Sequence, residues 1–226
     1  MTALLEPCMV IAVLLNFYIL SVSRLKMLIV VVAIQGVILG LMYPIVHQGF
    51  APTAEAGLDL IPLVRLLALT IAIIAIKGSL IPVMLNRAVL LADIRSTVTS
   101  VIGFVPSLLI GGVGAAIVFV FAQQLPVSPD HHSPLLIPTS LTTVLTGFLI
   151  LVTRREALAQ VLGYIVMENG IFIFGLLLIE AVPILVELGV VLDLFVGVFV
   201  MGIIVHHVSR AFPEASTEHL ASLKEL

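Results

Sequence analysis

Charged residues, cysteine and tryptophan are all scarce in this chain of 226 residues. Only 10% of the residues are charged and 61% are hydrophobic, whereas soluble proteins carry about 25% charged residues. The single cysteine, Cys8, excludes a disulfide framework, an iron–sulfur cluster and a cysteine-based zinc site built by this chain alone. Because tryptophan is absent, tyrosine and phenylalanine have to supply any aromatic belt. The composition predicts an integral membrane protein.

Sequence motifs of soluble enzymes are also missing. We find no phosphate-binding loop, dinucleotide fingerprint or nucleophile elbow. We therefore expect no catalytic, cofactor-binding or metal-binding residue on this chain, and no contact with nucleic acid. His131 and His132 have no third ligand nearby, so a solvated loop is favoured over a metal site. The first apolar segment lacks a basic flank and a cleavage site, so we expect a retained span rather than a signal peptide.

Polar turns divide the chain into seven apolar segments, each of about the 20 residues that cross a bilayer. We place them near residues 4–23, 27–47, 61–85, 97–123, 137–153, 158–181 and 184–207. The turns at 24–26, 86–95 and 154–156 and the tail from 209 hold eight of the ten lysines and arginines. By the positive-inside rule, the N-terminus lies outside the cytoplasm and the C-terminus inside. The sequence thus predicts an all-α, polytopic membrane protein with seven transmembrane helices.

We divide the chain into three parts. Residues 1–134 form a four-helix membrane part, residues 135–208 a three-helix module, and residues 209–226 a polar cytoplasmic tail. Pro82 and Pro106 are expected inside spans, where each kinks the helix or frees a carbonyl group. The small-residue stretches 35–40 and 111–116 predict close packing between helices.

Two apolar helices near the C-terminus each carry one acid near the middle, Glu168 and Asp193. An ionisable group at the bilayer centre is costly, so it usually serves a function. At 1.5 Å per residue, each acid lies roughly 15 Å from one end of its helix. Neighbouring helices lie about 8–10 Å apart, so one or two waters can bridge the two carboxyl groups. We therefore predict proton transfer through Glu168 and Asp193.

Lys77 is the third charge expected at this depth, about 12 Å from the end of the third predicted helix. An intramembrane amine usually pairs with an acid, and Glu168, Asp193 or an acid on a partner chain all fit. The alternative is a structural ion pair between Lys77 and one acid that fixes the helix register. Three ionisable groups at similar depth favour the relay.

Other polar residues are expected to have lesser roles. Arg65, near the outer end of the third helix, is expected to anchor it by snorkelling. Glu187 flanks the outer corner of the last two helices; we expect a solvated carboxylate there, with a place on the proton exit path as the alternative. Asn16, Gln35 and Asn169 are expected to form interhelical hydrogen bonds.

The last three predicted helices resemble the K subunit of respiratory complex I and the C subunit of multisubunit cation/proton antiporters. The likeness rests on Arg154, Arg155, Gly163 and the run from Asp193 to Gly197. It implies a proton-transferring glutamate on each of two helices, with Asp193 as the second. The first falls at Ile165 in that pattern, whereas Glu168 lies roughly 4.5 Å further along on about the same face.

The chain as a whole resembles the hydrogenase-4 component E family. The motifs are Lys77 with Leu80, Ile81 and Pro82, then Gly163, Tyr164, Met167 to Gly170, Glu187 to Gly189, and Asp193. The resemblance implies a non-catalytic subunit of a hydrogenase complex in the plasma (inner) membrane of a prokaryote. It also implies that the nickel–iron centre and iron–sulfur clusters lie on partner subunits. The partners would be hydrophilic hydrogenase subunits and two kinds of membrane subunit, antiporter-like and complex I H-like.

The hypothesis from the sequence is therefore a subunit that conducts protons, or Na⁺, through Glu168 and Asp193, with Lys77 as their charge partner. One alternative is a subunit of a cation/proton antiporter without a redox partner. Another is a scaffold that packs between larger antiporter-like subunits. A single-chain secondary transporter fits poorly, because seven spans without a clear inverted repeat do not match those architectures.

Overall fold

The computed structural model describes residues 2–46, 60–91, 98–125 and 134–177, together with Gly189, Phe195, Gly197 and Gly202. The helices are α1 (Thr2–Ser21), α2 (Leu25–Val46), α3 (Leu60–Ala75), the π-helix η1 (Ile76–Leu80), α4 (Ile81–Leu91), α5 (Phe104–Ala122), α6 (Leu136–Thr153) and α7 (Ala157–Leu177). Within these ranges, the β-pairing is limited to one isolated antiparallel bridge between Ser100 and Arg154. The prediction of an all-α fold is confirmed for the described part of the chain.

Six helices in these ranges are long and apolar enough to cross a membrane. The third of them, Leu63–Leu90, runs through α3, η1 and α4 without a break. The chain is therefore a multi-pass membrane protein. Apart from the four single residues named above, the seventh predicted span, 184–207, lies outside the described residues, and so do Asp193 and Glu187.

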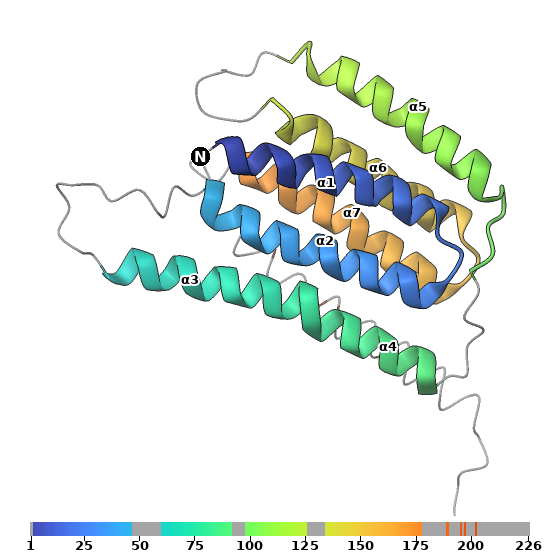
Figure 1. The fold of residues 1–226 in the computed structure, drawn as a ribbon. Coiled ribbons are helices and arrows are strands. Elements are labelled where there is room, and N and C mark those ends of the chain that lie inside the picture. Colours follow the sequence, from blue (N-terminus) through green and yellow to red (C-terminus); the bar gives the residue numbers. More distant parts are fainter. Residues whose placement is uncertain are drawn as a thin grey trace, which may run out of the picture.

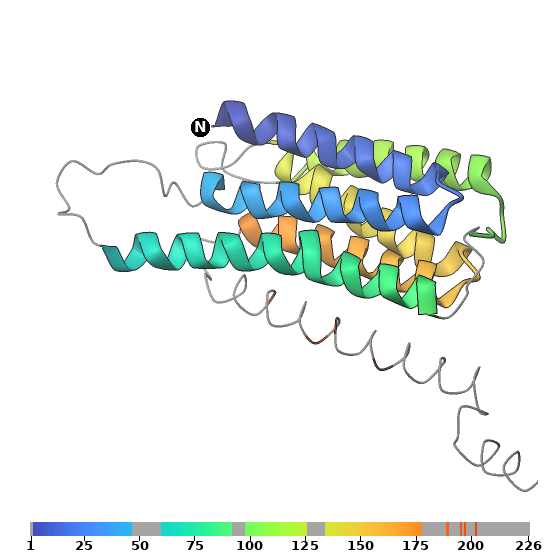
Figure 2. The ribbon, with the colours of Figure 1, turned by 60° about the horizontal axis from the view of Figure 1, so that its bottom comes forward.

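Four helices, α1, α2, α6 and α7, pack together at the centre of the structure (Figure 1). Helix α5 covers α6 and α1 on one side, and α3 with α4 lies against α2 on the other. The second view shows the same arrangement (Figure 2). Of the span residues in α6 and α7, 61% are buried, against 17% in α5. Helices α6 and α7 are therefore interior, and α5 is peripheral.

Glycines bring the backbones of α6 and α7 close together. A Cβ atom added to Gly163 would lie 2.9 Å from the backbone nitrogen of Leu151 and 3.0 Å from the carbonyl oxygen of Gly147. One added to Gly170 would lie 2.5 Å from the backbone nitrogen of Val144. A side chain at either position would force the helices apart, so glycine is what permits this approach.

The two predicted small-residue stretches do pack closely against neighbouring helices. On α2, a Cβ atom at Gly36 would lie 2.7 Å from the Cβ of Lys77, in the π-helix. On α5, a Cβ atom at Gly111 would collide with the side chain of Leu20. The packing prediction is confirmed at both places, and at Gly36 it determines how near α2 comes to Lys77.

The π-helix η1 interrupts the third span just ahead of Pro82. The backbone N–H of Ile81 donates to the carbonyl of Ile76, five residues back. Pro82 has no N–H, so the carbonyl of Gly78 loses the donor that a regular α-helix would supply. Such π turns are rare and occur often at functional sites. The prediction that Pro82 lies inside a span is confirmed, and η1 contains Lys77.

The end of the third span was predicted too early. The helix continues to Leu91 rather than stopping at 85, so Asn86 and Arg87 belong to α4 and not to a turn. Arg87 is exposed, whereas Ala88 and Val89 are buried. The helical burial pattern thus continues past a polar pair that the sequence alone marked as a break.

The start of the fourth span was also wrong. Helix α5 begins at Phe104 rather than at 97, because the preceding backbone is bound elsewhere: the N–H of Val98 donates to the carbonyl of Ser23. Gly103 then has a φ of 86°, which glycine adopts without strain. Pro106 lies within the span Phe104–Ala122, as predicted, but in the first turn of α5, where proline is well tolerated.

Candidate functional site: a buried polar chain across the bundle

Lys77 lies at the centre of the third span and is only 3% exposed. Its ammonium nitrogen donates a hydrogen bond of 3.2 Å to Oδ1 of Asn169. The same nitrogen lies 5.7 Å from the centroid of the Phe172 ring, within the range of a cation–π contact. Both partners are on α7, so the charge carried by the π-helix is held by an interior helix.

From Asn169 a chain of hydrogen bonds continues across the bundle. Asn169 Nδ2 donates to Gln35 Oε1 at 3.2 Å, and Gln35 Nε2 donates to Asn16 Oδ1 at 2.9 Å. Asn16 Nδ2 donates to the hydroxyl of Thr143 at 2.8 Å, which donates to the carbonyl of Thr139 at 2.7 Å. We call Asn169, Gln35, Asn16 and Thr143 the amide arm; all four side chains are completely buried.

The amide arm joins four different helices, namely α7, α2, α1 and α6. The predicted interhelical hydrogen bonds of Asn16, Gln35 and Asn169 are therefore confirmed. Thr143, at the far end, was not among the residues predicted from the sequence. A recognisable signal was present, because the buried hydroxyl residues of α6 recur at helical spacing. They are Thr139, Ser140, Thr142, Thr143 and Thr146.

Glu168 is buried in the middle of α7, with 5% of its surface exposed. It directly precedes Asn169 and comes one helical turn before Phe172, the two residues that contact Lys77. Residues four apart lie on the same face of a helix, so the carboxyl group lies on the stripe that carries Phe172. Glu168 and Lys77 are therefore both buried, and Glu168 directly precedes Asn169, which accepts the hydrogen bond of Lys77.

The other predicted residues are not part of this arrangement. Asp193 and Glu187 lie outside the described residues, so the water bridge between Asp193 and Glu168 stays a prediction. Arg65 is exposed on α3, as an anchoring side chain should be. His131 and His132 also lie outside the described residues.

A second buried cation, Arg154, lies at the end of α6. Its Nη2 donates to the carbonyl of Leu20 at 2.7 Å, and the guanidinium carbon lies 4.4 Å from the centre of the Phe104 ring. Burial lowers the pKa of Arg154, and the nearby Glu156 opposes that effect. Arginine remains charged even so, and Arg154 ties together the ends of α1, α5 and α6.

Glu156 is bound by the segment that precedes α5. Its Oε1 accepts hydrogen bonds from the hydroxyl of Thr99 at 2.6 Å and from the backbone N–H of Thr99 at 2.8 Å. Burial raises the pKa of Glu156, but the Thr99 hydrogen bonds and the charge of Arg154 outweigh it and leave the pKa below its ordinary value.

The turns rich in basic residues meet at this end of the bundle, at the right in Figure 1. The N–H of Val98 donates to Ser23 of the first turn, and the N–H of Arg155 donates to the carbonyl of Thr99. These bonds join the first turn, the segment before α5 and the end of α6 at one end of the bundle.

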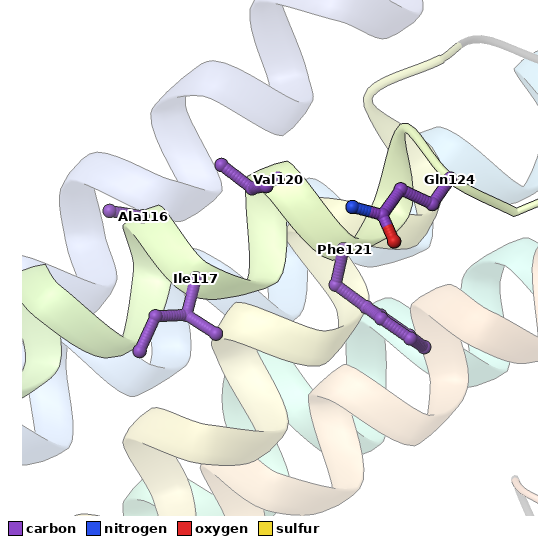
Figure 3. Close-up of a pocket in the computed structure, with 5 residues that line it drawn as sticks. All are labelled: Ala116, Ile117, Val120, Phe121 and Gln124. Atoms are coloured by element: carbon purple, nitrogen blue, oxygen red, sulfur yellow. The ribbon is translucent and has the colours of Figure 1, made fainter.

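A groove of about 420 Å³ runs along the outside of α5 (Figure 3). Its lining is apolar apart from Gln124 at the end of the helix: Ala116, Ile117, Val120, Phe121 and Gln124. It belongs to the peripheral helix and holds no ionisable side chain, unlike the interface around Lys77. Among the described residues there is also no group of three or more His, Cys, Asp or Glu that could hold a metal ion.

One known relative matches most of the chain. It is the Mycobacterium tuberculosis protein Rv0085, whose function is uncharacterized; it is 30% identical over 179 residues, which cover 75% of this chain and 81% of the relative. This chain belongs to the Rv0085 family. A family is thereby established, without an activity attached to it.

A second, shorter similarity is to a component of hydrogenase-4. Hydrogenase-4 component E of Escherichia coli is 35% identical over 80 residues, covering 35% of this chain and 37% of that protein. The same values hold for hydrogenase-4 component E of Shigella flexneri. The matching region thus spans little more than a third of the hydrogenase components. No family model and no solved structure matches this chain.

Proposed function

We propose that this chain is a non-catalytic membrane subunit of an energy-converting hydrogenase complex and that it takes part in proton translocation. The partial similarity to hydrogenase-4 component E supports the choice of complex. The observation that carries the proposal is the position of Lys77, which is buried at the centre of a span and bonded to Asn169, the residue that follows the buried Glu168. Ionisable groups at this depth are expensive and commonly mark ion or proton pathways.

Protons suit this site better than Na⁺. An ammonium group has three hydrogen-bond donors and no acceptor, so Lys77 repels a metal cation and offers it no ligand. A carboxyl group and an amine both bind and release protons. In this proposal Glu168 carries the proton, and Lys77 is the charge that Glu168 faces when it is ionised.

The other proton carriers, the orientation in the membrane and the partner subunits are proposed from the sequence. Asp193 is proposed as the second carrier and Glu187 as a group on the exit side. The end with Arg154 faces the cytoplasm of a prokaryote, the N-terminus faces outward, and the membrane is the plasma membrane. The nickel–iron centre and iron–sulfur clusters belong to hydrophilic partner subunits. Antiporter-like and complex I H-like subunits are the proposed neighbours in the membrane.

Proton uptake by membrane vesicles that contain the assembled complex tests the proposal. The quantity to compare is the number of protons moved per hydrogen molecule formed, in wild type, Glu168→Gln and the control Glu6→Gln. Glu6 is an exposed carboxylate on α1. We expect the ratio to fall at least tenfold in Glu168→Gln and to stay at the wild-type value in Glu6→Gln.

Three results would argue against this function. An unchanged ratio in Glu168→Gln, with a normal amount of complex, removes Glu168 from the path. Loss of the assembled complex, with a normal ratio in the fraction that remains, favours the scaffold instead. A complete operon of antiporter subunits around the gene, without hydrogenase subunits, would favour the antiporter alternative.

A further inference from the structure

All five hydrogen bonds from Lys77 to α6 point in the same direction. Lys77 donates to Asn169, and each member of the amide arm then donates to the next one, until the hydroxyl of Thr143 donates to the carbonyl of Thr139. In each amide, the oxygen faces the Lys77 end and the nitrogen faces the Thr143 end. The chain therefore has a polarity.

Lys77 fixes that polarity. An ammonium group can only donate a hydrogen bond, whereas the hydroxyl of Thr143 at the other end can donate or accept one. Reversing one amide would place two oxygens or two N–H groups face to face in a site that is completely buried. Unpaired polar groups in such a site are costly. The direction of the amides thus follows from the chemistry of Lys77.

The polarity affects Lys77 in two ways. Aligned hydrogen-bonded groups polarise one another, which strengthens each bond. In addition, the oxygen end of every amide dipole points toward the ammonium group, so the arm as a whole attracts the charge. Gln35 takes part in both effects through Asn169, which bonds to Gln35 and to Lys77.

The same chemistry prevents the arm from passing protons along. Side-chain amides donate and accept hydrogen bonds but, unlike carboxyl, imidazole or amine groups, have no titration near neutral pH. Three amides stand in series between Lys77 and the hydroxyl of Thr143. A proton that leaves Lys77 therefore does not travel along the amide arm.

We propose that Gln35 is a positioning residue: as the centre of a polarised amide arm that does not conduct protons, it holds the ammonium group of Lys77 in place through Asn169. The inference rests on the proposed function, since it assigns a role to the surroundings of Lys77 in proton translocation. It goes beyond that function in naming a residue that acts on Lys77 through Asn169 and in excluding the amide arm as a route for protons.

The test uses vesicles with the complete complex and measures protons moved per hydrogen formed, in Gln35→Leu, Lys77→Met and the double variant. Gln35→Leu is expected to lower the ratio about threefold to tenfold, the effect of losing one interhelical hydrogen bond in a membrane. In the Lys77→Met background, the same substitution is expected to cause no further loss, because the group that it positions is gone.

The far end of the arm supplies a second pair of variants. They test the inference even if Gln35→Leu assembles poorly. Thr143→Val removes the hydroxyl and should lower the ratio of protons to hydrogen. Thr143→Ser keeps the hydroxyl and should leave this ratio at the wild-type value. If Gln35 had only a structural role, the losses from Gln35→Leu and Lys77→Met would multiply in the double variant. That result overturns the inference about Gln35 and leaves the proposed function intact. A normal ratio in Lys77→Met alone removes Lys77 from the path and overturns both.

Discussion

The ammonium nitrogen of Lys77 lies 3.2 Å from the amide oxygen of Asn169, which is 92 positions later in the sequence. The contact joins the π-helix of the third span to α7, and it places the cation beside the residue that directly follows Glu168. A lysine in the middle of a membrane span is thus held by a polar chain that reaches across the bundle.

Close packing of α6 on α7 depends on glycine at particular positions. In Gly170→Ala, the new methyl group would collide with the backbone of Val144. Overpacking of this kind costs about 1–3 kcal/mol, so the thermal unfolding midpoint in detergent should fall by several degrees. Gly175→Ala is the control on the same helix, because a Cβ atom there meets nothing within 4 Å. An equal loss in both variants would contradict the account of α6 and α7.

Adjacent arginines give a matched pair at the end of α6. Arg154 is buried and binds the carbonyl of Leu20, whereas the side chain of Arg155 is exposed. Hydrogen bonds of charged groups contribute about 1.5–3 kcal/mol, so Arg154→Ala should lower the unfolding midpoint markedly. Arg155→Ala should change it little. The account of this corner fails if the exposed arginine proves to be as important as the buried one.

The corner around Glu156 should also respond to pH. Since the pKa of Glu156 in the folded state is depressed, its contribution to stability is complete above the ordinary value of 4.5 and is lost as the pH falls through the folded-state pKa. The unfolding midpoint should therefore decrease on acidification below about pH 4.5. Glu156→Gln should be less stable than wild type at neutral pH, and the difference should shrink in acid. A difference that does not depend on pH would be evidence against this assignment.

Much of the fold could be predicted from the sequence, because the bilayer imposes simple rules on length and polarity. The apolar runs identified the six spans of the described residues, and Gln35 and Asn169 were correctly expected to form interhelical hydrogen bonds. The boundary errors had a local cause. The polar pair Asn86 and Arg87 looked like a turn, yet an exposed side of a helix end accommodates it without interrupting the buried side.

The site was predicted in its components but not in its connections. Lys77 and Glu168 could be picked out because ionisable groups within an apolar span are costly and usually functional. That an amide oxygen binds Lys77 does not follow, because it depends on how α2, α7 and the π-helix are packed. The absence of a side chain at Gly36 permits that packing, and the sequence showed only that a small residue was present there.

The most direct test of the central claim compares two lysines. Lys77 is buried at the centre of a span, and Lys26 is exposed at the start of α2. In vesicles with equal amounts of assembled complex, Lys77→Met should reduce the protons moved per hydrogen formed at least tenfold, and Lys26→Met should leave the ratio at the wild-type value. A wild-type ratio in Lys77→Met would show that the buried lysine has no part in proton translocation.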